Sequence, residues 1–357
     1  MTVLYLNLVT VFSLGWIARY FSTPAMETNT YSPVEIKPSR YLTMLAMITL
    51  ILVSGLRTNI GDTFFYLHAY QLHEFTWKFV WSQKDIGFGL LQMMLKRLSE
   101  DPQILILFTA MITNMLIVLV LYKYSRMIEL SLFVYITSGL FLVSMNGIRQ
   151  FLAAAIIFAA TKYVMDGSWK KFIVVVLVAS TFHQSALILI PIYFLVRRKA
   201  WTRSTFALLV LAMIVVIGYN QFSSILFSAL EDTQYGHYSE FSEGGASILR
   251  VVVYAAPLFV AYLGREKLRD IFPKSDYIVN LCILNLIFMI IASQNWIFAR
   301  FTIYFGLYNL ILIAWIVKLV KERDQKLLYY GIIIFYLVYF YYEHVISLGI
   351  LYKSNYL

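Results

Sequence analysis

The chain has 357 residues, of which 61% are hydrophobic and only 13% are charged. A soluble domain is about half apolar and about a quarter charged. The composition therefore excludes a water-exposed globule and predicts a polytopic membrane protein. The net charge of +10 does not indicate a nucleic-acid partner, because Lys and Arg lie between apolar runs, as in cytoplasmic loops. A single cysteine, Cys282, excludes an internal disulfide and a cysteine-based metal site.

Long apolar runs define the expected membrane spans. A spanning helix needs about 20 mostly apolar residues. About ten runs approach this length, at residues 2–21, 41–56, 103–122, 130–146, 148–165, 206–227, 248–264, 276–292, 297–317 and 327–346. No repeat or soluble unit interrupts them. Residues 1–357 are therefore expected to form a single all-α integral membrane domain.

A further apolar stretch, residues 172–196, has a polar centre at 182–185. It is either one long span or a hairpin of two half-helices. Basic clusters at 170–171 and 197–199 flank it, and a hairpin puts both clusters on one side with most other Lys and Arg residues. Because basic loops stay cytoplasmic, the charge pattern favours the hairpin and places both termini outside.

Two outer segments in this topology are longer than simple connections. Residues 57–102 include an amphipathic-looking stretch at 86–98. This stretch is expected to lie in the interface or to re-enter the membrane, the alternative being an ordinary surface helix. Residues 228–247 form an acidic, tyrosine-rich loop. All five histidines fall on this outer side, which predicts extracellular chemistry.

Three arginines stand at the outer ends of spans: Arg57, Arg149 and Arg300. Charged side chains at such depth are costly and need a reason. The planar guanidinium binds phosphate oxygens in pairs. The three arginines are therefore expected to converge on a pyrophosphate, although each could instead extend to lipid headgroups.

Three residues are candidates for a general base. His183 lies at the polar centre of residues 172–196, where it could instead pin the helix break or bind a phosphate or a sugar hydroxyl. Asp62 is the carboxylate nearest in sequence to the arginines, and it could instead be a turn residue. Glu240 is a weaker candidate.

No metal or cofactor is expected from the motifs. His68 and His73 do not have the spacing of a metal-binding helix face, and the chain contains neither HExxH, a phosphate-binding GxxxxGK[ST] loop nor GxGxxG. Several polar and aromatic residues of the outer side are expected to contact a substrate glycan: Tyr66, Asn146, Gln150, Tyr235 and His237.

Four motifs in order resemble the EpsG family of exopolysaccharide polymerases, which are related to the Wzy O-antigen polymerases. They are Ser54-Gly55-Leu56-Arg57 followed by a Gly-Asp pair and Tyr66, then Asn146-Gly147-Ile148-Arg149-Gln150, then Phe182-His183-Gln184-Ser185-Ala186-Leu187 running on to Pro191-Ile192-Tyr193-Phe194, and finally Ile297-Phe298-Ala299-Arg300-Phe301 with Tyr304-Phe305-Gly306. Many members have Gly-Thr-Asp where this chain has Gly61-Asp62-Thr63, which puts the register of a role for Asp62 in question.

The resemblance implies a GT-C-like helical bundle and a metal-independent inverting glycosyltransferase in the cell membrane. The growing glycan would pass from undecaprenyl pyrophosphate to a sugar hydroxyl of a new lipid-linked repeat, making capsule or biofilm polysaccharide. Arg57, Arg149 and Arg300 would bind the leaving group and offset its growing charge. The candidate catalytic residues are Asp62, His183 and Arg149. A flippase and a chain-length regulator of the same pathway are the implied protein partners, beside membrane lipids.

Two other classes remain as alternatives. A transporter or flippase of lipid-linked oligosaccharides would show paired halves with matching broken helices, whereas this chain shows one broken element. A membrane O-acyltransferase would need an acyl-CoA site or relay at the cytoplasmic side, where no histidine is expected.

Overall fold

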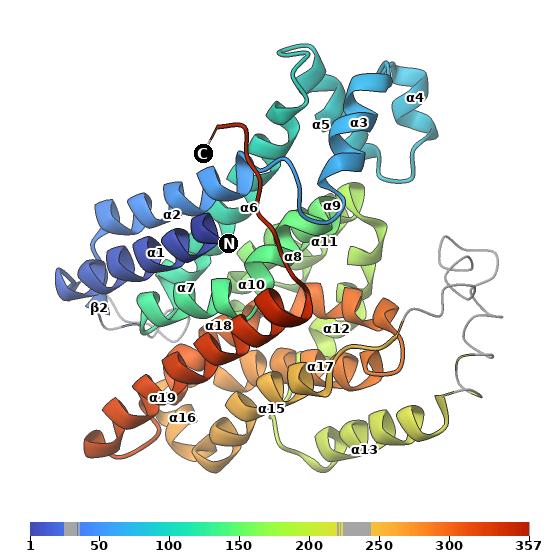
Figure 1. The fold of residues 1–357 in the computed structure, drawn as a ribbon. Helices are drawn as coiled ribbons and strands as arrows, with labels where there is room; N and C mark the ends of the chain where they lie inside the picture. Colours follow the sequence, from blue (N-terminus) through green and yellow to red (C-terminus); the bar gives the residue numbers. More distant parts are fainter. Residues whose placement is uncertain (25–33, 35, 220, 222, 224–243, 357) are drawn as a thin grey trace.

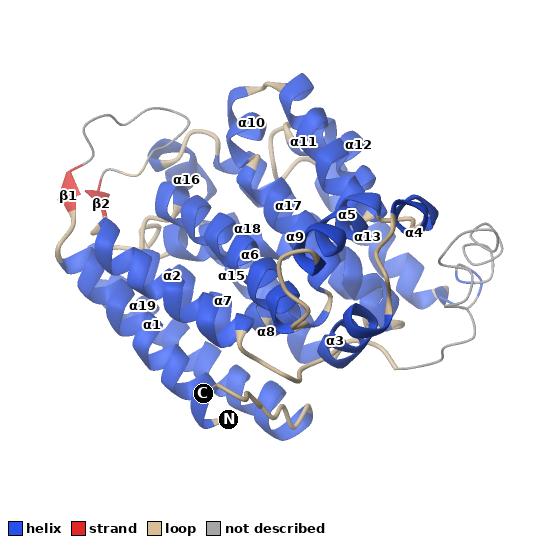
Figure 2. Ribbon diagram, turned by 90° about the horizontal axis from the view of Figure 1, so that it is seen from above, coloured by secondary structure: helices blue, strands red, loops and turns tan. Residues whose placement is uncertain are grey.

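The computed structural model describes residues 1–24, 34, 36–219, 221, 223 and 244–356, and these are mostly helical. Two short strands, β1 (Thr23–Pro24) and β2 (Ile36–Lys37), pair antiparallel at one end of the helical bundle, and α3 (Thr63–Leu72) and α4 (Trp77–Ser82) lie at the other end (Figures 1 and 2). The two chain termini lie near each other in both views. The expectation of an all-α membrane protein is met at this level.

Four described helices are long and apolar enough to cross a membrane: α1 (Thr2–Tyr20), α6 (Gln103–Tyr124), α17 (Ser275–Ala292) and the segment Trp296–Ile316, which contains η3 (Trp296–Phe298) and α18 (Ala299–Ile316). The number rises to six if two bent helix pairs each count as one span. This is fewer than the roughly ten continuous spans expected from hydropathy.

Helix breaks account for much of the difference. The run expected at 130–146 is divided into α7 (Ile128–Thr137) and α8 (Leu140–Asn146), which meet at 55°. The run at 148–165 is divided into α9 (Ile148–Ala159) and α10 (Thr161–Asp166). Others are apolar but short, namely α2 (Arg40–Gly55) and α13 (Arg203–Ile217). Hydropathy records the apolar run but not where its backbone turns.

The last third of the chain contains two further bent or broken helices. α15 (Ile248–Leu263) turns by 81° into α16 (Arg265–Ile271), and α19 (Glu322–Phe340) continues as the π-helix η4 (Tyr341–Ser347). α18 is the centre of the bundle, because it contacts α7, α9, α15 and α17 and is buried on all sides from Thr302 to Ile316. A helix that is apolar all round requires such burial.

The segment 172–196 is a hairpin. α11 (Trp169–Phe182) ends at His183, whose backbone is extended, and the chain continues as η1 (Gln184–Ile188) and α12 (Leu189–Val196). The two open ends of the hairpin, which carry the basic clusters, lie together, since a Cβ atom on Gly167 would lie 2.6 Å from Arg197 Nη1. Non-helical backbone within an apolar run needs protein contacts, and the contacts of the break are described below.

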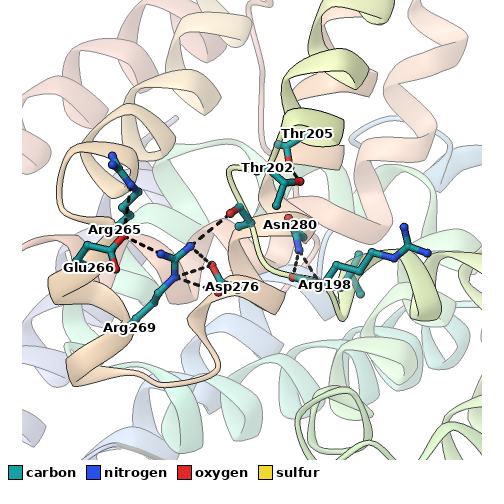
Figure 3. Close-up of polar contacts among 10 residues, drawn as sticks. Arg198, Thr202, Thr205, Arg265, Glu266, Arg269, Asp276 and Asn280 are labelled. Carbon is teal, nitrogen blue, oxygen red and sulfur yellow. Dashed lines mark hydrogen bonds and ion pairs between the residues drawn. The ribbon is translucent and has the colours of Figure 1, made fainter.

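Polar contacts tie the chain after this hairpin to α16 and α17 (Figure 3). The Arg269 guanidinium donates to Asp276 at 3.1 Å and to the Ala200 carbonyl at 3.3 Å. Asn280 Nδ2 donates to the Arg198 carbonyl at 2.7 Å. The basic segment 197–199 therefore lies beside the basic α16 segment at one end of the bundle.

The segment 57–102, which is expected on the outer side, folds into three short helices, α3, α4 and α5 (Ile86–Lys96). α5 covers most of the amphipathic stretch expected at 86–98. It packs closely on α11, because a Cβ atom at Gly87 would lie 2.2 Å from Thr181 Oγ1. Of the second outer segment expected, 228–247, only residues 244–247 lie within the described part of the chain.

Candidate active site

Two adjoining cavities open at the end of the bundle that carries α3, α4 and α5. They share Arg149, Gln150, His183 and Arg300 as lining residues. The first cavity, of about 410 Å³, is also lined by Lys84, Asp85 and Ser185. The second, of about 460 Å³, is also lined by Asp62, Tyr66, Asn146, Arg250 and His344. The tertiary structure thus brings most of the candidate residues into one continuous site.

Arg149 lies in the first turn of α9, directly after the chain turns at Gly147. Its Nη1 atom is 2.9 Å from Asp85 Oδ2, and its guanidinium carbon is 5.9 Å from the Phe88 ring centroid. The Tyr66 side chain interacts with the same guanidinium. Arg149 is 43% exposed as a side chain, so it reaches the cavity while its direction is fixed from α5.

Asp85 lines the first cavity and was not among the residues selected in the sequence analysis. Its Oδ1 atom accepts from the Gln184 backbone N–H at 3.2 Å, while Oδ2 binds Arg149. One carboxylate therefore joins the start of α5, the break of the hairpin and α9. Burial raises the pKa of the Asp85 carboxyl, and Arg149 and the Gln184 N–H oppose this effect. Local sequence showed only a polar residue ahead of an apolar stretch.

His183 stands at the break between α11 and η1 and lines both cavities. Its Nδ1 atom is 2.7 Å from Ser185 Oγ, which is 2.8 Å from the Tyr304 hydroxyl on α18. This chain of hydrogen-bonding groups fixes the ring against the central helix. Within the described residues, no hydrogen bond to Nε2 is present.

Arg300 lies in the first turn of α18 and lines both cavities. Its guanidinium carbon is 4.9 Å from the Trp296 ring centroid, which orients the side chain through a cation–π contact. Gln150 Nε2 donates to the Arg300 carbonyl at 2.9 Å. Gln150 was expected to contact a glycan, and in the structure its side chain anchors the backbone at Arg300.

Arg57 does not line either cavity, contrary to the expected convergence of three arginines. It is 1% exposed, and its guanidinium donates to Thr63 Oγ1 at 3.0 Å, to the Met145 carbonyl at 2.6 Å and to the Ser54 carbonyl. The two carbonyls end α8 and α2, where helices lack internal donors. Arg57 therefore joins two helix ends behind the site, and direct contact of Arg57 with a diphosphate stays a prediction.

Asp62, Tyr66 and Asn146 line the second cavity. The Asp62 backbone N–H donates to Asn146 Oδ1 at 3.0 Å. Gly61 has φ +53°, and a Cβ atom there would lie 2.1 Å from Asn146 Oδ1. Position 61 therefore requires glycine, because its backbone approaches Asn146 of α8 closely. Tyr235, His237 and Glu240, the other expected site residues, lie outside the described residues.

The fold and these cavities define a helical membrane protein with a cationic, partly enclosed site at one end of the bundle. The sequence model of the EpsG family matches residues 40–356, so the chain belongs to the EpsG family. This membership supports a polysaccharide polymerase role. No match was found among curated proteins or among solved structures. Over the described residues, no group of three His, Cys, Asp or Glu side chains is arranged to hold a metal ion.

Proposed function

We propose that the protein is a GT-C-type inverting glycosyltransferase that polymerises lipid-linked exopolysaccharide repeats at the outer face of the cell membrane. The observation that carries the proposal is the meeting of Arg149, His183 and Arg300 in one site of an EpsG-family protein. The first cavity is lined by three cationic side chains, Lys84, Arg149 and Arg300, against one carboxylate, Asp85. An excess of positive charge suits a diphosphate.

The donor in this proposal is a growing glycan attached to undecaprenyl pyrophosphate, and the acceptor is a new lipid-linked repeat. The acceptor hydroxyl oxygen forms a bond to the anomeric carbon of the donor on the face opposite the pyrophosphate. The bond between that carbon and the pyrophosphate oxygen breaks, which inverts the anomeric configuration. Negative charge grows on the leaving oxygen, and Arg149 and Arg300 stabilise that increase. Only the part of their binding that strengthens in the transition state accelerates the step.

The proton of the acceptor hydroxyl passes to a base in the site. His183 and Asp62 both line the second cavity. His183 is the better oriented, because its Nδ1 is held by Ser185 Oγ, which in turn bonds to the Tyr304 hydroxyl. When Ser185 accepts from Nδ1–H, the Nε2 lone pair can take the proton. Tyr66, Asn146 and Gln150 are proposed to contact the glycan from the same walls.

The experiment incubates the purified protein with lipid-pyrophosphate repeat units in the presence of a chelator. A ladder of longer glycans is expected, because no metal is required in the proposed reaction. Absence of elongation with intact repeat units contradicts the polymerase, and elongation that the chelator abolishes contradicts metal independence. A transporter of the same lipids would instead move them between the leaflets of a vesicle without lengthening them.

A further inference from the structure

A second polar cluster lies on the wall of the second cavity formed by α15, α19 and η4. Arg250 Nε is 2.6 Å from Glu343 Oε1, and Ser247 Oγ donates to Glu343 Oε2 at 3.4 Å. Glu343 is 2% exposed, and Arg250 reaches the cavity. The Tyr339 hydroxyl interacts with the same guanidinium. The cluster is therefore a built arrangement of hydrogen-bonding groups whose two charges cancel.

His344 follows Glu343 in the π-helix η4 and lines the same cavity. The residue is 5% exposed, and its Nδ1 atom has no hydrogen-bond partner among the described residues. Its ring stacks on Phe340 with centroids 5.2 Å apart. A buried polar atom without a partner is uncommon and needs an explanation. Single π-helical turns within α-helices are often retained at functional sites.

The two cavities differ in their aromatic lining and not in their balance of charge. Beyond the shared Arg149 and Arg300, Lys84 and Asp85 line the first cavity and Asp62 and Arg250 line the second, one residue of each sign in both. The Arg250 charge is also paired with Glu343. Aromatic side chains add apolar ring faces to the second cavity, which suit an uncharged polyol: Tyr66, Tyr254, Trp296 and Tyr339.

We propose that Arg250, Glu343 and His344 form a subsite for a neutral sugar of the lipid-linked glycan. A sugar bound here lies against the His344 ring, and the Arg250 guanidinium, fixed by Glu343, donates to a sugar oxygen. Glu343 acts through Arg250 as a positioning residue. The inference rests on the proposed function, because it places the sugars next to the reacting pyrophosphate end.

The test compares substrate KM with the affinity for inorganic pyrophosphate. In His344→Leu and in the double variant Arg250→Gln/Glu343→Gln, KM for lipid-linked repeats should rise about tenfold, while the pyrophosphate Kd measured by calorimetry should stay unchanged. His344→Asn keeps a polar group at this position and should retain part of the affinity. Arg300→Gln should weaken pyrophosphate binding. An unchanged KM in a folded His344→Leu protein overturns the proposal, as does loss of pyrophosphate binding in the double variant.

The matched control removes a comparable ion pair at the other end of the bundle. Arg19 pairs with Glu129, which is fully buried, so Arg19→Gln/Glu129→Gln reports the effect of losing a buried pair on folding alone. It should leave KM unchanged; a KM rise as large as that of the cavity double variant contradicts a local sugar contact.

A second measurement keeps this inference separate from polymerase activity. The repeat oligosaccharide, released from its lipid pyrophosphate, should give a saturation-transfer NMR signal with the wild-type protein, and His344→Leu should lose most of it. This result supports the sugar subsite even if no ladder forms. Equal signals from the two proteins contradict the subsite whether or not polymerisation occurs.

Discussion

The ion pair between Arg149 and Asp85 sets both the charge and the direction of the first cavity. Asp85 is 9% exposed and accepts from two donors, whereas Arg149 keeps nearly half of its side chain accessible. The main role of the Asp85 carboxylate is therefore to orient the Arg149 guanidinium, and not to contact solvent or a ligand. A planar fork held in this way can offer paired donors to phosphate oxygens, which an ammonium group cannot.

We predict that Arg149→Lys lowers polymer formation about 10- to 100-fold, the effect of losing one or two charge-assisted hydrogen bonds. Lysine keeps the positive charge but not the fork. The measurement is the rate of glycan elongation by the purified variant. Arg265→Lys is the matched control, because Arg265 is also paired, with Glu266 at 3.5 Å, and is 41% exposed as a side chain at the other end of the bundle. Full activity of Arg149→Lys would show that the reaction does not need the paired donors of the guanidinium group.

Asp85→Asn should reduce kcat more than KM, because Arg149 then loses the charge that orients it. The pH profile distinguishes this role from a structural one. Burial raises the pKa of the Asp85 carboxyl above the ordinary 3.8, so its charge and the ion pair are present at high pH and are lost as the pH falls through the raised pKa. Wild-type activity should fall on that acid limb, and Asp85→Asn should not show it. An identical acid limb in the variant argues against Asp85 as its source.

At the scale of elements, the break between α7 and α8 positions the wall of the second cavity. Gly139 has φ +86°, and a Cβ atom there would lie 2.2 Å from His344 Nε2. The left-handed backbone and the close approach both require glycine. A straight helix over residues 130–146 would place α8, and with it Asn146, away from the site.

Gly139→Ala should lower the free energy of unfolding by about 1–2 kcal/mol for the backbone conformation alone, and the clash with His344 adds to this. The measurement is Tm of the detergent-purified protein. Gly331→Ala is the control, because Gly331 lies inside α19 with no atom within 4 Å of an added Cβ, and alanine favours a helix interior. If both variants melt alike, the break does not depend on this glycine.

At the scale of the whole molecule, the two ends of the bundle carry different chemistry. The cavities lie at the end with α3, α4 and α5, and the Arg269 network joins residues 198–200 to α16 and α17 at the other. The C-terminal segment also packs against the loop that follows α2: Lys353 N–H donates to Asn59 Oδ1 at 2.7 Å, and Ser354 Oγ donates to the Leu56 carbonyl at 2.6 Å. Residues far apart in sequence thus hold the loop that carries Asp62.

A reporter fused after Lys199 should be cytoplasmic, and one inserted after Gln83 should be extracellular. Lys199 lies at the end of the bundle that carries the basic segment 197–199 and α16, and basic loops stay cytoplasmic. Gln83 lines the first cavity, which is proposed to be extracellular. An insertion after Pro273 provides the control, because its loop lies beside residues 198–200 and should report the same side as Lys199. An external signal after Lys199 would reverse the proposed orientation.

The sequence by itself determined the class of protein, the hairpin at 172–196 and the family, because these depend on composition, charge order and short motifs. It also selected Arg149 and Arg300 at the edges of apolar runs and His183 at the polar centre of one, and the fold brings the three to one site. Such signals are local in the sequence and can be read without knowledge of the tertiary structure.

Only the tertiary structure decided which polar groups meet. Asp85 is 64 residues from Arg149 and 99 from Gln184, so no local pattern connects them. Arg57 looked like the other two arginines in sequence, yet its side chain turns inward to helix-end carbonyls. Arg250 and Glu343 are adjacent only because α15 packs beside η4. Hydropathy predicts that a segment is buried, whereas side-chain direction and helix breaks arise from packing between distant segments.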